Sequence, residues 1–136
     1  MTELILLGAQ GRLGSEVLSL WGEEHVQPLL RTSWPSKEKL REFLLQFQAS
    51  RPVLLDVSHS LATKQLVSFL LELETLPLAG LVIGTTGHDL QAELEQLAQR
   101  YPICVRPNFS QGVFLLQQIL QAQTPSGLSV QDLARQ

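Results

Sequence analysis

The sequence has one cysteine, little positive charge and no long apolar run, and each shortage argues against a class of protein. Cys104 is the only cysteine among 136 residues, so no intrachain disulfide framework and no Cys-based zinc site can form. The apolar run after Met1-Thr2-Glu3 is only four residues long, too short for a signal-peptide core or a membrane span. We therefore expect a cytoplasmic protein without a membrane segment.

Charge and composition argue against further classes of protein. Lys and Arg total 10 against 13 Asp and Glu, which gives a formal net charge of −3. No basic cluster is present to meet a phosphate backbone, and this argues against nucleic-acid binding. The apolar fraction of 44% and the charged fraction of 17% are ordinary for a globular protein. A chain of this length can bury a core as one domain, and Cys104 is expected inside it as a small apolar residue.

Short apolar runs alternate with longer stretches of helical periodicity, which is typical of βαβ units that build a parallel sheet. The runs are rich in Val, Ile and Leu without clean alternation, as expected when helices cover both faces. The expected strands are residues 3–7, 25–30, 52–57, 80–83 and 103–106, and the expected helices are 11–21, 36–48, 60–74, 89–100 and 111–122. Ser36 and Ser60 are the expected helix N-caps.

The pattern predicts an α/β fold of the Rossmann type, with a doubly wound, mainly parallel sheet. No repeat or linker divides the chain, so residues 1–136 are expected to form a single domain. Its last part, residues 124–136, opens with Pro125-Ser126-Gly127 and is expected to form a turn and a short helix that packs back on the domain.

A glycine-rich loop, Gly8-Ala9-Gln10-Gly11-Arg12-Leu13-Gly14, follows the first expected strand. Glycines let backbone N–H groups approach phosphate oxygens closely, and the next helix offers its positive N-terminal end. The spacing is a variant of the dinucleotide fingerprint Gly-x-Gly-x-x-Gly. In its context of strand, loop and helix it predicts dinucleotide binding, and a purely structural tight turn is the alternative.

The end of the second expected strand bears on which dinucleotide is bound. An Asp or Glu there would accept from the ribose hydroxyl of NAD. The sequence instead reads Leu30-Arg31-Thr32-Ser33, and Arg31 could pair with the 2′-phosphate of NADP. NADP(H) is therefore favoured and NAD(H) is kept as the alternative, with an ordinary exposed arginine as the functionally neutral interpretation.

Three further polar segments follow expected strands and should meet at the carboxyl edge of the sheet, where ligands bind in open α/β folds. They supply small residues and hydroxyls suited to a nicotinamide site, although each could be no more than a helix cap. The segments are residues 56–60, which include Ser58, residues 84–88, and residues 107–112, in which Phe109 could pack against a ring.

Four ordered motifs resemble the dihydrodipicolinate reductases (4-hydroxy-tetrahydrodipicolinate reductases) of bacterial lysine and diaminopimelate synthesis. The resemblance extends from Leu4 to about Val113, nearly all of the nucleotide-binding part of that family. It rests on the glycine loop, on Asp56-Val57-Ser58 with Ala62-Thr63, on Val82-Ile83-Gly84-Thr85-Thr86-Gly87, and on Asn108-Phe109-Ser110-Gln111-Gly112-Val113.

The resemblance implies a role for each part of the cofactor site. The pyrophosphate would lie on Gly8, Ala9, Gln10, Gly11, Arg12 and Leu13, the adenosine end on Arg31, the nicotinamide ribose region on Gly84, Thr85 and Thr86, and the nicotinamide face on Arg106, Pro107, Asn108 and Phe109. The chain departs from the family at Leu30, where members often carry an acidic residue that serves NADH. This departure also favours NADPH.

A larger departure is the substrate domain. Family enzymes follow the Asn-Phe-Ser segment with a domain that carries a His-His pair and a nearby Lys, and nothing of that size follows Val113. The tail could match the substrate-carboxylate loop at residues 124–127 or, as we favour, the family's closing segment at residues 125–133. No catalytic residue is assigned, because the histidines are isolated and the lysines lie on expected helices: His25, His59, His88, Lys37, Lys39 and Lys64.

Three functions follow from these observations. The chain could be a reductase-type protein that binds NAD(P)H, with His59 and His88 as alternative proton donors beside the pocket. It could be a non-catalytic dinucleotide-binding or docking module that forms a homo-oligomer or meets a protein partner. Trp21, Trp34 and Phe114 are then candidates for an exposed apolar surface, although packing in the core is the commoner place for aromatic residues. In the third, the loop survives only as a fold element.

Overall fold

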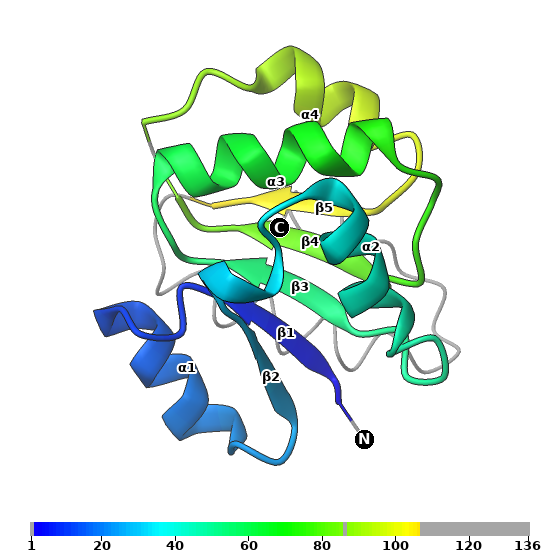
Figure 1. The fold of residues 1–136 in the computed structure, drawn as a ribbon. Helices are drawn as coiled ribbons and strands as arrows, with labels where there is room; N and C mark the ends of the chain where they lie inside the picture. Colours follow the sequence, from blue (N-terminus) through cyan, green and yellow to red (C-terminus); the bar gives the residue numbers. More distant parts are fainter. Residues whose placement is uncertain (1, 86, 107–136) are drawn as a thin grey trace.

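The computed structural model describes residues 2–85 and 87–106, and the structural statements below concern these residues. Strands and helices alternate along them (Figure 1). In chain order the elements are β1 (Leu4–Leu7), α1 (Arg12–Trp21), β2 (Val26–Leu29), the 3₁₀ turn η1 (Arg31–Ser33), α2 (Lys37–Leu45), β3 (Val53–Asp56), α3 (Ser60–Glu72), β4 (Gly80–Ile83), α4 (Gln91–Leu97) and β5 (Ile103–Val105).

The five strands form one parallel sheet in the order β2-β1-β3-β4-β5. This is one of the two common doubly wound orders, and it reverses direction between β1 and β3. The registers align the last residues of β1, β3 and β4, which are Leu7, Asp56 and Ile83. Ligands of such folds bind outside the carboxyl ends of the strands at this reversal, so β1 and β3 mark the place to look.

The reversal also explains why helices lie on both faces of the sheet. Right-handed crossovers put α1, which connects β1 to its neighbour on one side, on one face, and α2, α3 and α4 on the other (Figure 1). Alternate strand residues supply the two cores: Ile5 and Leu7 belong to the core under α2, α3 and α4, whereas Leu4 and Leu6 pack against α1. The Rossmann-type α/β fold that the sequence predicts is confirmed.

The strands and helices predicted within the described residues are confirmed, and their ends either coincide with the predicted ones or lie up to three residues inside them. Ser36 caps α2 as predicted, because its hydroxyl accepts from the Lys39 N–H. The predicted Ser60 cap is wrong: His59 caps α3 through its ring Nδ1, which accepts from Ala62 N–H at 3.4 Å. The turn η1 is not predicted, and the predicted helix 111–122 and the tail 124–136 lie outside the described residues.

Cys104 and the two tryptophans are also placed. Cys104 is buried as predicted, and burial raises the pKa of its thiol, an effect that Arg106 partly offsets. Trp34 is only 2% exposed and packs edge-to-face on Phe69, so its predicted place in an exposed apolar surface is wrong. Trp21 is partly buried against the core under α1, and Phe114 lies outside the described residues.

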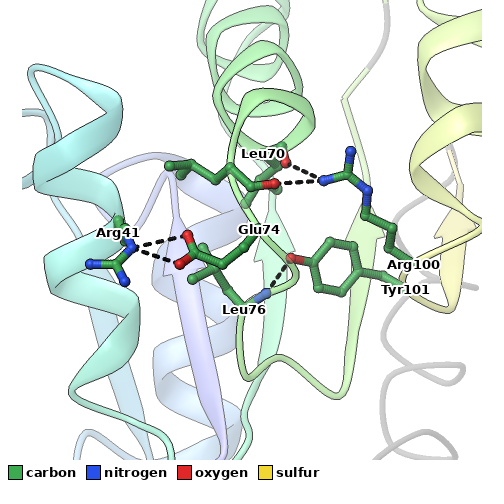
Figure 2. Close-up of polar contacts among 7 residues, drawn as sticks. Arg41, Leu70, Glu74, Leu76, Arg100 and Tyr101 are labelled. Carbon is green, nitrogen blue, oxygen red and sulfur yellow. Dashed lines mark hydrogen bonds and ion pairs between the residues drawn. The ribbon is translucent and has the colours of Figure 1, made fainter.

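The amino ends of β4 and β5 are fastened by side-chain hydrogen bonds (Figure 2). The buried Tyr101 hydroxyl accepts from the Leu76 N–H at 2.7 Å. Arg100 donates to the last carbonyls of α3, at 2.7 Å from Leu73 O and at 3.1 Å from Leu70 O. Arg41 on α2 pairs with both carboxylate oxygens of Glu74 at 2.9 Å. These contacts hold the connection from α3 to β4 at the edge of the sheet opposite to the strands' carboxyl ends.

Candidate functional site

A cleft of about 510 Å³ opens at the carboxyl ends of β1, β2 and β3. It lies beside the reversal of the strand order, as expected for a ligand site in this fold. Its walls come from the three connections that follow these strands and comprise Leu7, Gly8, Ala9, Gln10, Gly11, Leu29, Leu30, Arg31, Thr32, Trp34, Val57, Ser58, His59, Leu61, Ala62 and Gln65.

The glycine loop forms the first wall, and its shape depends on glycine at two positions. Gly8 has φ +96°, and a Cβ there would lie 2.8 Å from the Ser58 backbone nitrogen. A Cβ on Gly14 would lie 2.0 Å from the Gly8 carbonyl oxygen, so α1 could not start this close to the loop with another residue. The loop therefore brings the start of α1 against the end of β1.

The N-terminus of α1 is open for hydrogen bonding. Gly11 is its N-cap, no side chain caps it, and its first turn carries no acidic residue. The first backbone N–H groups of a helix have no partner inside the helix, and they favour an anion together with the helix dipole. A pyrophosphate fits this arrangement, and a Cβ added to Gly11 would meet only the Gly8 oxygen, at 3.4 Å.

The second wall follows β2 and carries positive charge. Arg31 begins η1 and is exposed, and it forms no ion pair with any residue that the structure describes. Leu30 is 43% exposed beside it, and the buried Trp34 lies behind. None of the described lining residues is Asp or Glu, so Arg31 gives this cleft a positive character.

The third wall is the connection from β3 into the first turns of α3. Leu61 there is 72% exposed although it is apolar, and it lines the cleft together with Ala62 and Gln65. His59 also lines the cleft, but its Nδ1 is engaged with the start of α3. Ser58 is half-buried, and its backbone N–H and hydroxyl both donate to Asp56.

The structure brings six of the predicted cofactor residues together along this cleft: Gly8, Ala9, Gln10, Gly11, Arg31 and Ser58. Arg12 and Leu13 lie in the first turn of α1 and do not line it. The sequence did not predict Trp34, Leu61, Ala62 or Gln65 as parts of the site. The one signal in the sequence for these residues is Leu61, an apolar residue directly after the first residue of an expected helix.

Other predicted residues lie at the ends of β4 and β5. Gly84 N–H donates to Asp56 O, and Arg106 N–H donates to Ile83 O, each at 2.8 Å. Thr85 is 6% exposed, so its side chain is buried. Thr86, Pro107, Asn108 and Phe109 lie outside the described residues.

The histidines do not converge on one point. His25 lies between Glu3 and Glu24 at the amino end of β2, His59 caps α3, and His88 Nε2 lies 3.1 Å from Thr85 O. Within residues 2–85 and 87–106 no group of three or more His, Cys, Asp or Glu residues is placed to hold a metal ion. No helix in that part of the chain has the length and apolar character needed to cross a membrane.

Comparison with known families identifies the family of the chain. The sequence profile described as dihydrodipicolinate reductase, N-terminus, matches residues 2–109 of the 136. No curated protein sequence matches the chain significantly. The matched range contains every strand and helix that the structure describes as well as the whole lining of the cleft. The chain therefore belongs to the dihydrodipicolinate reductase N-terminal family, and it is a nucleotide-binding domain of that type.

Proposed function

We propose that this domain binds NADP(H), with the pyrophosphate at the start of α1 and the adenosine end in the cleft against Arg31. The observation that carries the proposal is the composition of the cleft: Arg31 and the glycine loop line the same cavity, and no described lining residue is a carboxylate. A 2′-phosphate would meet a cation there, whereas the 2′-hydroxyl of NAD(H) would find no acidic acceptor.

The apolar residues of the cleft suit the adenine ring. Leu30 and Leu61 come from different connections, both line the cleft, and the two residues are 43% and 72% exposed. A flat ring placed against them would remove that surface from water, worth about 25 cal/mol per Å² buried. We assign these two leucines to the adenine site, next to the phosphate partner Arg31.

The expected strength of the Arg31 contact can be bounded. A charge-assisted hydrogen bond contributes about 1.5–3 kcal/mol, and exposure of the guanidinium to water reduces this. A loss of about 1–2 kcal/mol corresponds to roughly 5- to 30-fold in affinity. NADH, which lacks the 2′-phosphate, should be almost insensitive to the same substitution.

Calorimetric titration of NADPH and NADH into the wild-type domain and the Arg31→Ala variant tests the assignment. Lys39→Ala is the matched control, because Lys39 also carries one positive charge but lies on α2, outside the cleft, where it pairs with Glu42 at 3.3 Å. We expect Arg31→Ala to weaken the binding of NADPH but not of NADH. Lys39→Ala should change neither affinity. Equal affinities of wild type and Arg31→Ala for NADPH would refute the assignment of the 2′-phosphate to this residue.

The proposed function is binding of the dinucleotide and not catalysis of a reduction. A reduction would need hydride from NADPH and a proton from an acid near the substrate. Among the described lining residues the only candidate acid is His59, and its ring nitrogen Nδ1 caps α3. The alternative that this favours is a dinucleotide-binding module without catalysis of its own, which an assay of NADPH oxidation by the domain would test.

A further inference from the structure

Asp56, the last residue of the central strand β3, carries a carboxylate that is completely buried. Its Oδ1 accepts from the Ser58 N–H at 2.9 Å and from the Ser58 hydroxyl at 2.5 Å. Its Oδ2 accepts from the Thr63 hydroxyl at 2.5 Å. No Lys, Arg or His within the described residues forms an ion pair with it. Neutral donors from its own connection and from α3 therefore hold this carboxylate.

Thr63 extends these bonds to the connection that follows β4. Its Oγ1 lies 2.8 Å from the Thr85 Oγ1, and it has one proton, which it donates to Asp56 and shares weakly with the His59 carbonyl at 3.1 Å. Thr85 must then donate its own proton to Thr63. Thr63 and Thr85 are both buried, so the Thr85 hydroxyl is committed inside the protein.

The glycine loop meets the same group of residues from the other side. Gly8 packs so closely on the Ser58 backbone that a Cβ would lie 2.8 Å from its nitrogen. The register puts Asp56 between the last residues of β1 and β4, which are Leu7 and Ile83. The connections after β3 and β4 are therefore joined through one buried carboxylate, and the connection after β1 packs on Ser58, which donates to that carboxylate.

The order of the strands indicates which half of a dinucleotide these connections would contact. With the adenosine end near β2 and the pyrophosphate near β1, the remaining half of a dinucleotide extends over β3 and β4. We propose that Asp56, acting through Thr63, is a positioning residue that fixes Thr85, at the end of β4, for the nicotinamide half of the dinucleotide. This inference rests on the proposed function. A fully satisfied buried network is rigid, so Thr85 would lose little freedom on binding.

The test is to remove one hydroxyl at constant shape. Thr63→Val deletes the link between Asp56 and Thr85 and leaves both Ser58 bonds to Asp56 in place. We expect its affinity for NADPH to fall by about tenfold, in the range of coupled networks. Its affinity for 2′-phospho-ADP, which has the adenosine, its 2′-phosphate and the pyrophosphate but neither the nicotinamide nor its ribose, should change by less than about twofold.

Two companion variants separate positioning from general damage. Thr63→Ser keeps the hydroxyl and should restore NADPH affinity, and Thr85→Val, which keeps the bond from Thr63 to Asp56, should reproduce the difference between the two ligands. Equal losses for both ligands, or no loss for NADPH, would overturn the inference. Failure of the wild-type domain to bind NADPH would instead overturn the proposed function, and the inference with it.

Discussion

Removing the hydroxyl of Tyr101 should destabilise the domain without changing its binding of NADPH. Tyr101 is 2% exposed, and its oxygen accepts from the Leu76 N–H at 2.7 Å (Figure 2). Tyr101→Phe leaves this buried N–H without a partner, which costs about 1–3 kcal/mol. For a chain of 136 residues, each kcal/mol shifts Tm by roughly 3–4 °C, so we expect Tm to fall by roughly 4–10 °C.

The same side chain predicts a pH dependence. Burial raises the pKa of Tyr101 above its ordinary value of 10.0, an effect that the hydrogen bond from Leu76 partly offsets. The unfolded chain then loses the phenol proton at lower pH than the folded one, so the contribution of Tyr101 to stability is constant below about pH 10 and is lost as pH rises above it. In Tyr101→Phe this part of the alkaline loss should disappear.

Thermal unfolding followed by circular dichroism, at neutral pH and at pH values above about 10, measures both effects. The shift that NADPH produces should be the same in wild type and Tyr101→Phe, because Tyr101 precedes β5 at the edge of the sheet opposite to the cleft. A variant as stable as wild type at neutral pH would refute the account of this hydrogen bond.

Three further predictions follow from single observations. Gly8→Ala should destabilise the domain by more than about 1–2 kcal/mol and weaken the binding of NADPH, because φ is +96° and the added Cβ meets the Ser58 backbone. Chemical denaturation measures the first effect and a binding titration the second. Arg41→Ala should change stability by less than about 1 kcal/mol, since its ion pair with Glu74 is exposed, and a larger loss in a denaturation curve would contradict this. The domain alone should not oxidise NADPH in the presence of freshly made dihydrodipicolinate, and sustained loss of NADPH absorbance would show a catalytic arrangement beyond the described residues.

The sequence predicts the fold well because the strongest local signals agree with the tertiary structure. Leu4–Leu7 and Gly80–Ile83 are short, fully apolar strands, and the helices between strands show clear periodicity. The predicted N-cap of α3, Ser60, is wrong for a local reason. Serine is the commoner cap, but here His59 has the extended backbone and accepts the bond, whereas Ser60 is already helical.

The site is predicted only where a motif implies it. The glycine loop and Arg31 follow from their spacing after strands, and the structure places both along one cleft. Leu61 and Trp34 join that cleft through tertiary packing, which no local pattern reports. The same holds for the bond between Thr63 and Thr85, which are 22 positions apart in the chain. Pairings of this kind depend on which strands are neighbours.

The central claim, that the domain binds a dinucleotide in its cleft, is tested most directly by thermal unfolding of the wild-type protein with increasing NADPH or NADH. A ligand at a hundred times its dissociation constant stabilises the folded state by about 2.7 kcal/mol. We predict that Tm rises with NADPH and rises less with NADH at equal concentration. A Tm that neither nucleotide changes would contradict the claim and leave the glycine loop as an element of the fold alone.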